Sequence, residues 1–375
     1  MKFGIFFELS VPHPVTKAGE QKAYADALEQ ARLADELGFD YIWCVEHHFL
    51  ESYSHCAAPE VFMAAASMVT KNIRFGHGGV VCVPQMNHPI RVAERAAALD
   101  IVSGGRLDVG TARSSTWTEL GGFQADPDTT KVTWDEFVRV LPKMWTQERF
   151  SWQGTSFSMP ERMVIPKPVQ DPHPPLWVTV TTPGTELDAA ERGIGCLGVA
   201  DTSYAEQERR TNEYRRRIQY CDPVGAVNNQ VSVVNRLYCH EDPDVAFQRG
   251  MRLVGTYGLA NAHLWWTREA YPTRAYQSLA NLSPRQVQEK GSAAERRALE
   301  GTCIGDPEQI TQALKRWESL GVDGVNFLVG ELDLIPQAQV MESIRLFARE
   351  VMPKFKKSAN GTAPAGAATP AEVRA

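Results

Sequence analysis

The feature of this sequence that most constrains its fold is a regular alternation of short β-rich runs with longer amphipathic stretches. This alternation is typical of βα units arranged around a parallel sheet. Several of the runs are apolar on consecutive residues rather than on alternate ones, as expected for strands that are covered on both faces. The eight strand candidates are Lys2–Phe7, Tyr41–Val45, Ile73–Val83, Arg106–Gly110, Leu176–Val180, Gly195–Ala200, Val231–Cys239 and Gly324–Val329.

Eight strands with one helix apiece fit a closed (β/α)8 barrel better than an open doubly wound sheet. Helical periodicity fills the intervals between the runs, for example over Ala23–Leu37 and Ala93–Val102. A chain of 375 residues is long for one ordinary domain, but a barrel with insertions reaches this size as a single domain. The sequence therefore predicts the α/β fold class, with one TIM-barrel domain over residues 1–355.

Two segments interrupt the repeat, and a third closes the chain. Residues 150–175 are rich in proline and aromatic side chains, which indicates an insertion before the fifth strand. Residues 258–302, between the seventh and eighth strands, are predicted to form a second insertion, and loops of this length tend to be lids, substrate walls or mobile segments. The tail, residues 356–375, has almost nothing to bury and is predicted to be disordered.

Composition excludes several classes of function. A net charge of −6 provides no electrostatic footprint for nucleic acid or for an anionic membrane. No apolar run approaches the roughly 20 residues that a membrane span needs, and the opening Met1–Glu8 turns acidic too early for a signal peptide. None of the seven cysteines forms a C-x-x-C pair, so we expect buried free thiols and a cytoplasmic protein.

In a barrel of parallel strands, reacting residues cluster in the loops at the carboxyl ends of the strands. Glu46-His47-His48-Phe49 follows the second run. Adjacent residues of an extended segment point in opposite directions, so at most one of the two histidines faces the barrel mouth. We expect that histidine to act as an acid or base and its neighbour to be structural. The histidines of the chain lack recognised ligand spacing, so no metal site is predicted.

A candidate phosphate site follows the fifth run. Thr181-Thr182-Pro183-Gly184-Thr185 precedes a predicted helix, and hydroxyls with free backbone N–H groups at a helix N-terminus can bind an anion. Arg113, from the neighbouring strand end, could add a charge-assisted contact. An ordinary helix cap beside a surface arginine is the alternative. Gly193–Gly198 matches G-x-G-x-x-G, but a helix precedes it and a strand follows, the reverse of the dinucleotide fingerprint.

Taken together, the motifs resemble those of the bacterial luciferase superfamily of flavin-dependent oxidoreductases, from Met1 to about Phe355. Each motif is weak, but their order and spacing are specific. The motifs are Met1-Lys2-Phe3-Gly4, Glu46-His47-His48-Phe49, His88-Pro89-Ile90-Arg91 with Ala93-Glu94, Ser103-Gly104-Gly105-Arg106, Gly110 with Arg113, Ala189-Ala190-Glu191-Arg192-Gly193, Ile304-Gly305-Asp306-Pro307 and Gly321-Val322-Asp323.

The resemblance implies a barrel that encloses FMN across the strand carboxyl ends. His47 matches the histidine that lies over the flavin and assists its peroxide chemistry, with Glu46 beside it as the second catalytic candidate. Gly78-Gly79 falls where relatives carry an unusual cis peptide under the flavin ring, a bond that costs roughly 3 kcal/mol. The remaining implied cofactor-binding residues are Phe6, Arg113, Thr181, Thr182 and Thr185.

The sequence also departs from bacterial luciferase. Ala112 stands where luciferase has a reactive cysteine, and Thr181-Thr182 stands where it has glutamate and serine. These departures put light emission from a long-chain aldehyde in doubt and leave flavin binding intact.

The main hypothesis is a two-component monooxygenase, in which reduced FMN and O2 oxygenate a small organic substrate. A separate NAD(P)H:flavin reductase would supply the reduced flavin, and a homodimer is usual for proteins of this kind. Relatives that use the deazaflavin F420 for hydride transfer, a metal-dependent barrel hydrolase and a flavin-binding protein without catalysis are the alternatives. The Glu46-His47-His48-Phe49 turn favours FMN over F420.

Overall fold

The computed structural model describes residues 1–51, 53–114, 116–182, 184–200, 202–263, 273 and 301–355. The part of the second predicted insertion that spans 264–272 and 274–300, and the predicted tail 356–375, lie outside the described residues.

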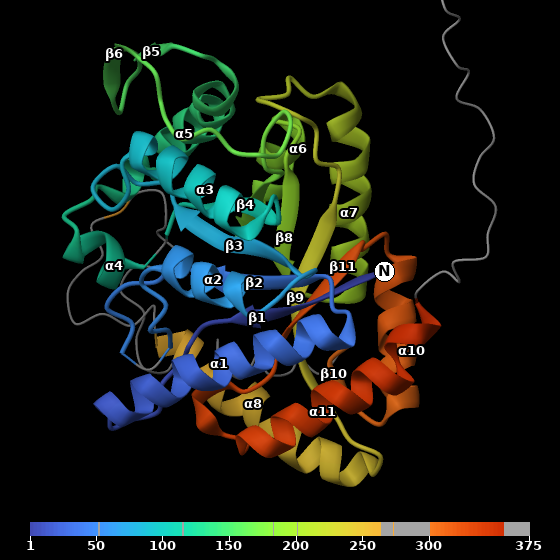
Figure 1. Cartoon of the computed structure of the whole chain (residues 1–375). Helices are drawn as coiled ribbons and strands as arrows, with labels where there is room; N and C mark the ends of the chain where they lie inside the picture. Colours follow the sequence, from blue (N-terminus) through green and yellow to red (C-terminus); the bar gives the residue numbers. More distant parts are fainter. Residues whose placement is uncertain are drawn as a thin grey trace, which may run out of the picture.

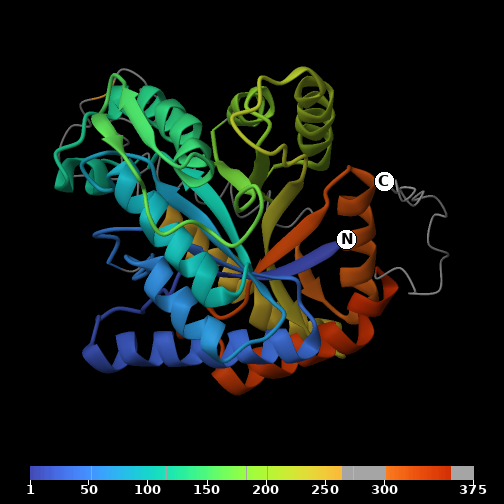
Figure 2. The ribbon, with the colours of Figure 1, turned by 45° about the horizontal axis from the view of Figure 1, so that its top comes forward.

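Eight parallel strands close into a barrel, in the order β11-β1-β2-β3-β4-β7-β8-β9, with β9 pairing back onto β11. Figures 1 and 2 show the strands at the centre with the helices packed around them. The predicted fold class is therefore confirmed. The barrel strands are β1 (Lys2–Phe7), β2 (Tyr41–Val45), β3 (Arg74–Val81), β4 (Leu107–Ala112), β7 (Leu176–Val180), β8 (Gly195–Val199), β9 (Val231–Cys239) and β11 (Gly324–Leu328).

Several helices begin or end at residues that cap their free backbone groups. Helices α1 and α3 end at Gly38 (φ 78°) and Gly104 (φ 69°), which adopt the left-handed conformation that glycine tolerates best. Asp306 caps α10 with a complete capping box. The helices are α1 (Lys17–Leu37), α2 (Pro59–Met68), α3 (Pro89–Ser103), α4 (Trp117–Gly122), α5 (Thr130–Thr146), α6 (Thr185–Glu191), α7 (Tyr204–Arg217), α8 (Pro243–His263), α10 (Pro307–Ser319) and α11 (Gln337–Glu350).

Two elements lie outside the simple repeat. The segment between β4 and β7 contains an antiparallel hairpin, β5 (Phe150–Gln153) with β6 (Ser158–Arg162), which lies against α5 and away from the barrel strands (Figure 2). Glu136 of α5 accepts hydrogen bonds from the side chains of Trp152 and Ser156 and so holds the hairpin in place. The short strand β10 (Cys303–Gly305), which the sequence did not predict, extends the sheet beyond the distal part of β9.

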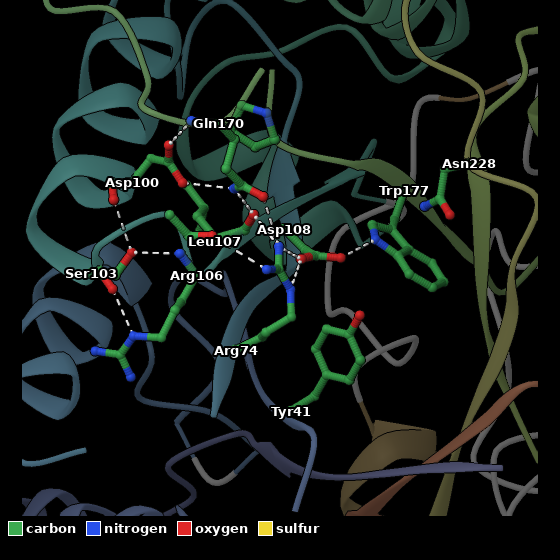
Figure 3. A network of polar contacts seen from close by, with 12 residues as sticks. Tyr41, Arg74, Asp100, Ser103, Arg106, Leu107, Asp108, Gln170, Trp177 and Asn228 are labelled. Carbon is green, nitrogen blue, oxygen red and sulfur yellow. Dashed lines mark hydrogen bonds and ion pairs between the residues drawn. The ribbon is translucent and has the colours of Figure 1, made fainter. Parts of the chain in front are cut away.

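A polar network closes the end of the barrel where the strands begin (Figure 3). Arg74 Nε donates to Asp108 Oδ1 at 2.8 Å, and Trp177 Nε1 donates to Asp108 Oδ2 at 2.8 Å. Gln170 links this pair to α3, because its Nε2 donates to Asp100 Oδ1 at 2.7 Å. In barrels, residues at this end serve stability and the opposite end carries the chemistry.

Among the described residues, no helix has the length and apolar character to cross a membrane. All seven cysteines are free thiols, and six of them are buried, as the sequence analysis predicted.

Candidate active site

Residues with strained backbone and buried charged side chains lie in the loops at the mouth of the barrel. Six described residues other than glycine have positive φ; five lie in segments that follow barrel strands, and Gln124 follows α4. Such strain costs of order 1 kcal/mol or more per residue and persists where the surrounding structure requires it, commonly at functional sites. These residues are Leu9, Phe49, Ser114, Gln124, Leu332 and Asp333.

His47 lies at this mouth, at the end of β2, and a buried carboxylate holds its ring. Nδ1 is 3.0 Å from Glu119 Oε1, and Glu119 is 1% exposed. The same carboxylate accepts hydrogen bonds from the His48 backbone N–H at 3.1 Å and from Ser114 Oγ and Thr116 Oγ1 at 2.9 and 2.7 Å. Four donors therefore fix Glu119, and Glu119 fixes the orientation of the imidazole.

A second carboxylate approaches the other ring nitrogen of His47. Nε2 lies 3.8 Å from Glu8 Oε2, which is an ion-pair distance and too long for a hydrogen bond. Burial alone would lower the pKa of His47, but Glu119, through its charge and hydrogen bond, and then Glu8 and Glu46 through their charges, raise it to about 9. The imidazole is thus an imidazolium at neutral pH, and its side chain keeps 26% exposure to the mouth.

The two adjacent histidines point to different partners, as the extended geometry predicted. His48 Nε2 lies 3.2 Å from Glu46 Oε1, and its ring packs edge-on against Phe123 at 4.9 Å between centroids. Glu46 also accepts hydrogen bonds from the Val81 backbone N–H at 2.8 Å and from Asn87 Nδ2 at 2.7 Å. Glu46 therefore contacts His48, the end of β3 and the loop that follows it. The carboxylate that contacts His47 by a hydrogen bond is Glu119.

Gly78 and Gly79 lie at an irregularity in β3. The register with β2 shifts so that Cys44 pairs with His77 and Val45 with Gly79. A Cβ on Gly78 would come within 3.0 Å of the Phe6 ring, and one on Gly79 within 2.9 Å of Ala112 Cβ. All cis peptides among the described residues precede proline. The cis bond that the resemblance implied at Gly78-Gly79 is therefore absent, and a β-bulge provides the close backbone approach instead.

Arg113 and the threonine loop meet at the neighbouring strand ends. Arg113 Nη2 donates to Thr185 Oγ1 at 3.3 Å, which joins the end of β4 to the first residue of α6. Thr182 is half-buried and its carbonyl accepts the Thr185 N–H at 3.2 Å, whereas Thr181 is exposed. Glu186 Oε2 accepts the Gly184 N–H at 2.9 Å, so that donor is occupied. The groups that can donate hydrogen bonds to a ligand here are therefore the Arg113 guanidinium and the threonine hydroxyls.

Aromatic side chains form one wall of the mouth. Phe49 and Phe123 lie 5.3 Å apart between ring centroids, and Phe123 contacts His48. A Cβ on Gly122 would come within 2.5 Å of the Phe49 ring, so glycine is required for this approach. Both phenylalanines contact His48, the chain neighbour of His47, and the His47 ring itself packs edge-on against Tyr53 at 5.4 Å between centroids.

Glu119 and Glu8 were not among the residues predicted from the sequence. Glu119 lies three residues after Thr116, and T-x-x-E at a helix start is a capping-box signal, but here one carboxylate oxygen accepts from the Thr116 hydroxyl and the other contacts His47. Glu8 directly follows β1, so the rule that chemistry follows strand ends would have found it.

Among the described residues, no group of three or more His, Cys, Asp or Glu side chains could hold a metal ion.

Residues 1–324 match the family model of luciferase-like monooxygenase. Over 366 residues the chain is 23% identical to the oxygenase component of flavin-dependent trigonelline monooxygenase from Acinetobacter baylyi, covering 96% of each chain. It is 27% identical over 370 residues to 4-hydroxyprotoasukamycin monooxygenase from Streptomyces nodosus subsp. asukaensis, covering 96% of this chain and 94% of the relative. An uncharacterized protein of Sinorhizobium fredii is 32% identical, but the match spans only 53% of this chain and 57% of that relative.

Solved structures of similar shape include the monooxygenase RslO1 from Streptomyces bottropensis, with a TM-score of 0.78, 26% identity and coverage of 95% of this chain and 100% of the other. The oxygenating constituent of 3,6-diketocamphane monooxygenase from Pseudomonas putida, in complex with FMN, has a TM-score of 0.72 at 18% identity, covering 94% and 98%. An F420-dependent secondary alcohol dehydrogenase has a TM-score of 0.71 at 18% identity, covering 95% and 99%. At 18% identity these two show the fold alone.

Proposed function

Because this chain belongs to the luciferase-like monooxygenase family, we propose that it is the oxygenase of a two-component system that uses reduced FMN and O2 to oxygenate a small organic substrate. The predicted family and enzyme class, a flavin-dependent monooxygenase, are thereby confirmed. The FMN assignment, the separate NAD(P)H:flavin reductase and the small substrate are the proposal. The single observation that carries it is the His47–Glu119 pair in a mouth that also presents Arg113 and Thr185.

The residues at the mouth fit FMN. A flat ring needs a floor of backbone, and Gly78 and Gly79 supply backbone without side chains where neighbouring protein atoms leave no room for a Cβ. A phosphate needs a charged donor, and Arg113 is half-buried and already directed to the hydroxyl of Thr185. In this assignment Phe6 packs under the glycines, and Thr181 and Thr182 add polar groups at the rim.

Bound reduced FMN would supply the reaction with O2 that delivers one oxygen atom to the substrate. The side chains of this chain then control protons and water. His47 holds a proton at Nε2 while Glu119 fixes Nδ1, so the imidazolium can donate into the mouth without turning. The aromatic wall of Phe49 and Phe123 excludes water, whose access would divert the reaction to hydrogen peroxide. Glu46 positions His48, and through it the wall.

Three further assignments belong to the same proposal. We assign residues 1–355 to a single domain and the enzyme to the cytoplasm, in agreement with its free thiols. We also propose a homodimer, because α2 and α3 pack side by side and carry exposed apolar residues on their outer faces. These are Val61 and Met68 on α2, 66% and 75% exposed, and Ile101 and Val102 on α3, 43% and 53% exposed. Sedimentation of wild type against a Met68→Glu, Val102→Glu double variant tests the dimer, which should dissociate.

The function is tested by supplying reduced FMN from an NADH-driven reductase, with isotopically labelled oxygen and a panel of small apolar compounds. We expect one compound to gain a single labelled oxygen atom and to lower the hydrogen peroxide released per O2 consumed. The control replaces FMN with oxidised F420, a hydride acceptor, under anaerobic conditions. Oxidation of substrate in that control, without label, would favour the F420 alternative and contradict the proposal.

A further inference from the structure

A second set of buried polar residues lies in the segments that follow β1 and β11. Glu8 follows β1 and Glu331 follows β11, and these strands are neighbours. Glu8 is 3% exposed and Glu331 is 6% exposed. Burial, together with the charge of Glu8, raises the pKa of Glu331 to about 8, against the opposing effects of Ser10 and Arg236. Glu331 therefore carries a proton at neutral pH.

Ser10 connects Glu331 to the backbone on the outer side. Its hydroxyl donates to Glu331 Oε2 at 2.6 Å and accepts the Leu332 N–H at 2.8 Å. The contact lies between two stretches of left-handed backbone, with Leu9 at φ 53° on one side and Leu332 and Asp333 at 57° and 51° on the other. Both loops therefore have strained backbone next to the hydrogen bond between Ser10 and Glu331.

Ser10 and Glu331 also line a groove that opens to solvent between α1 and α11. These two helices lie side by side in both views (Figures 1 and 2). Lys22, Asp26, Gln30 and Gln337 are polar residues of the same groove. Glu331 therefore lies close enough to Glu8 for the charge of Glu8 to act on it, and it also lines a groove that is open to water.

We infer that Glu331 and Glu8 form a proton path that recharges His47 from solvent through the groove between α1 and α11. When His47 has donated its proton into the mouth, the O–H bond of Glu331 breaks and its proton passes to Glu8. Glu8 delivers a proton to His47 Nε2, where an N–H bond forms, and Glu331 is left as a carboxylate. Water in the groove then returns a proton to Glu331 beside Ser10. This path keeps solvent exchange separate from the mouth, where water must be excluded.

The inference rests on the proposed role of His47, but part of its test needs no flavin. In Glu331→Gln, the amide oxygen can still accept a hydrogen bond from Ser10, but the amide has no carboxyl proton to release. The matched control is Asp333→Asn, which changes a carboxylate on the same loop that is 44% exposed and paired with Lys22, and asparagine tolerates its left-handed backbone. The first measurement is the infrared carbonyl band of a protonated carboxylic acid in the protein without flavin.

We expect this band in wild type and in Asp333→Asn, disappearing as the pH rises through about 8, and we expect it to be absent from Glu331→Gln. A wild-type spectrum without the band, or a band that persists in Glu331→Gln, would overturn the inference whether or not FMN binds. In the loaded enzyme, Glu331→Gln should lower turnover about tenfold and alter its pH profile while the FMN dissociation constant stays within about twofold.

Ser10→Ala provides the second variant, since it keeps Glu331 and changes only the groove side of the path. We expect it to retain the infrared band and to lower turnover in a way that Asp333→Asn does not. Wild-type turnover and pH profile in both Glu331→Gln and Ser10→Ala would refute the path. Failure of wild type to bind FMN would refute the proposed function instead, and the infrared result would still stand by itself.

Discussion

His47 and Glu119 are separated by 72 positions in the chain and lie 3.0 Å apart between Nδ1 and Oε1. Burial would lower the pKa of His47, and Glu119 is the largest of the charges that raise it. His47 in turn holds the pKa of Glu119 below its usual range, against the opposing effect of burial. The pair is therefore an imidazolium and a carboxylate at neutral pH, which is the state that proton donation into the mouth requires.

Glu119→Gln should move the pKa of His47 from about 9 down to its ordinary value or below, because burial would then act with less opposition. Titration of the His47 ring resonances by NMR measures this directly. Glu46→Gln is the control, since Glu46 contributes a smaller charge effect, and it should shift the titration less. A His47 pKa that stays near 9 in Glu119→Gln would contradict the pairing.

His47→Ala should slow product formation about 100-fold, the scale of one general acid, while leaving the affinity for FMN nearly unchanged. The matched comparison is His48→Ala, which removes the adjacent imidazole and its contacts with Glu46 and Phe123. We expect a smaller loss there. Steady-state turnover and flavin titration of both variants check this, and equal losses would remove the distinction between the two histidines.

The buried acid Glu331 makes stability depend on pH in a defined direction. Its folded pKa of about 8 lies above the ordinary 4.5, so between these values the folded protein holds a proton that the unfolded chain has released. Stability is therefore full below about pH 4.5 and falls as pH rises through 8, by up to about 5 kcal/mol. Urea unfolding at pH 5.5 and 8.5 should show a smaller fall in Glu331→Gln than in wild type. An equal fall in the two proteins would contradict the assigned pKa.

The network at the opposite end of the barrel should affect stability and not chemistry (Figure 3). Arg74→Ala leaves Asp108, 1% exposed, without its charged partner, and we expect a loss of about 3–5 kcal/mol. Arg149→Ala, which breaks an ion pair between residues 56% and 64% exposed, should cost less than about 1 kcal/mol. Chemical denaturation measures both, with FMN affinity as the functional control. If the folded Arg74→Ala protein bound FMN more weakly than wild type, the assignment of this network to stability alone would be contradicted.

Much of the fold could be predicted from the sequence because buried parallel strands leave a strong local signal. The observed bounds of β1, β2, β7 and β9 coincide with the predicted apolar runs. The three-residue strand β10 was missed, since so short a run has no period of its own. The predicted run continues to Val83, but β3 ends at Val81, because the Val83 N–H bonds back to the Val81 carbonyl at 2.9 Å and the chain turns there.

The candidate site could be predicted only in part. His47, Arg113 and Thr185 follow from the rule that functional residues lie after the strands, and the structure brings Arg113 and Thr185 together. The partners Glu119, Glu8 and Glu331 could not be assigned, because their roles depend on which distant side chain each one meets after the barrel closes. A carboxylate at a helix start is normally a cap, and only the tertiary structure turns Glu119 toward His47.

The central claim is that the mouth binds a flavin whose phosphate is held by Arg113. It is tested most directly by measuring dissociation constants of reduced FMN and reduced riboflavin for wild type, for Arg113→Ala and for the surface control Arg91→Ala, whose side chain is 66% exposed. We predict that wild type and Arg91→Ala prefer FMN about 10- to 100-fold, as expected for a charged hydrogen bond, and that this preference is lost in Arg113→Ala. Equal preference for FMN in all three proteins, or no flavin binding by wild type, would contradict the account.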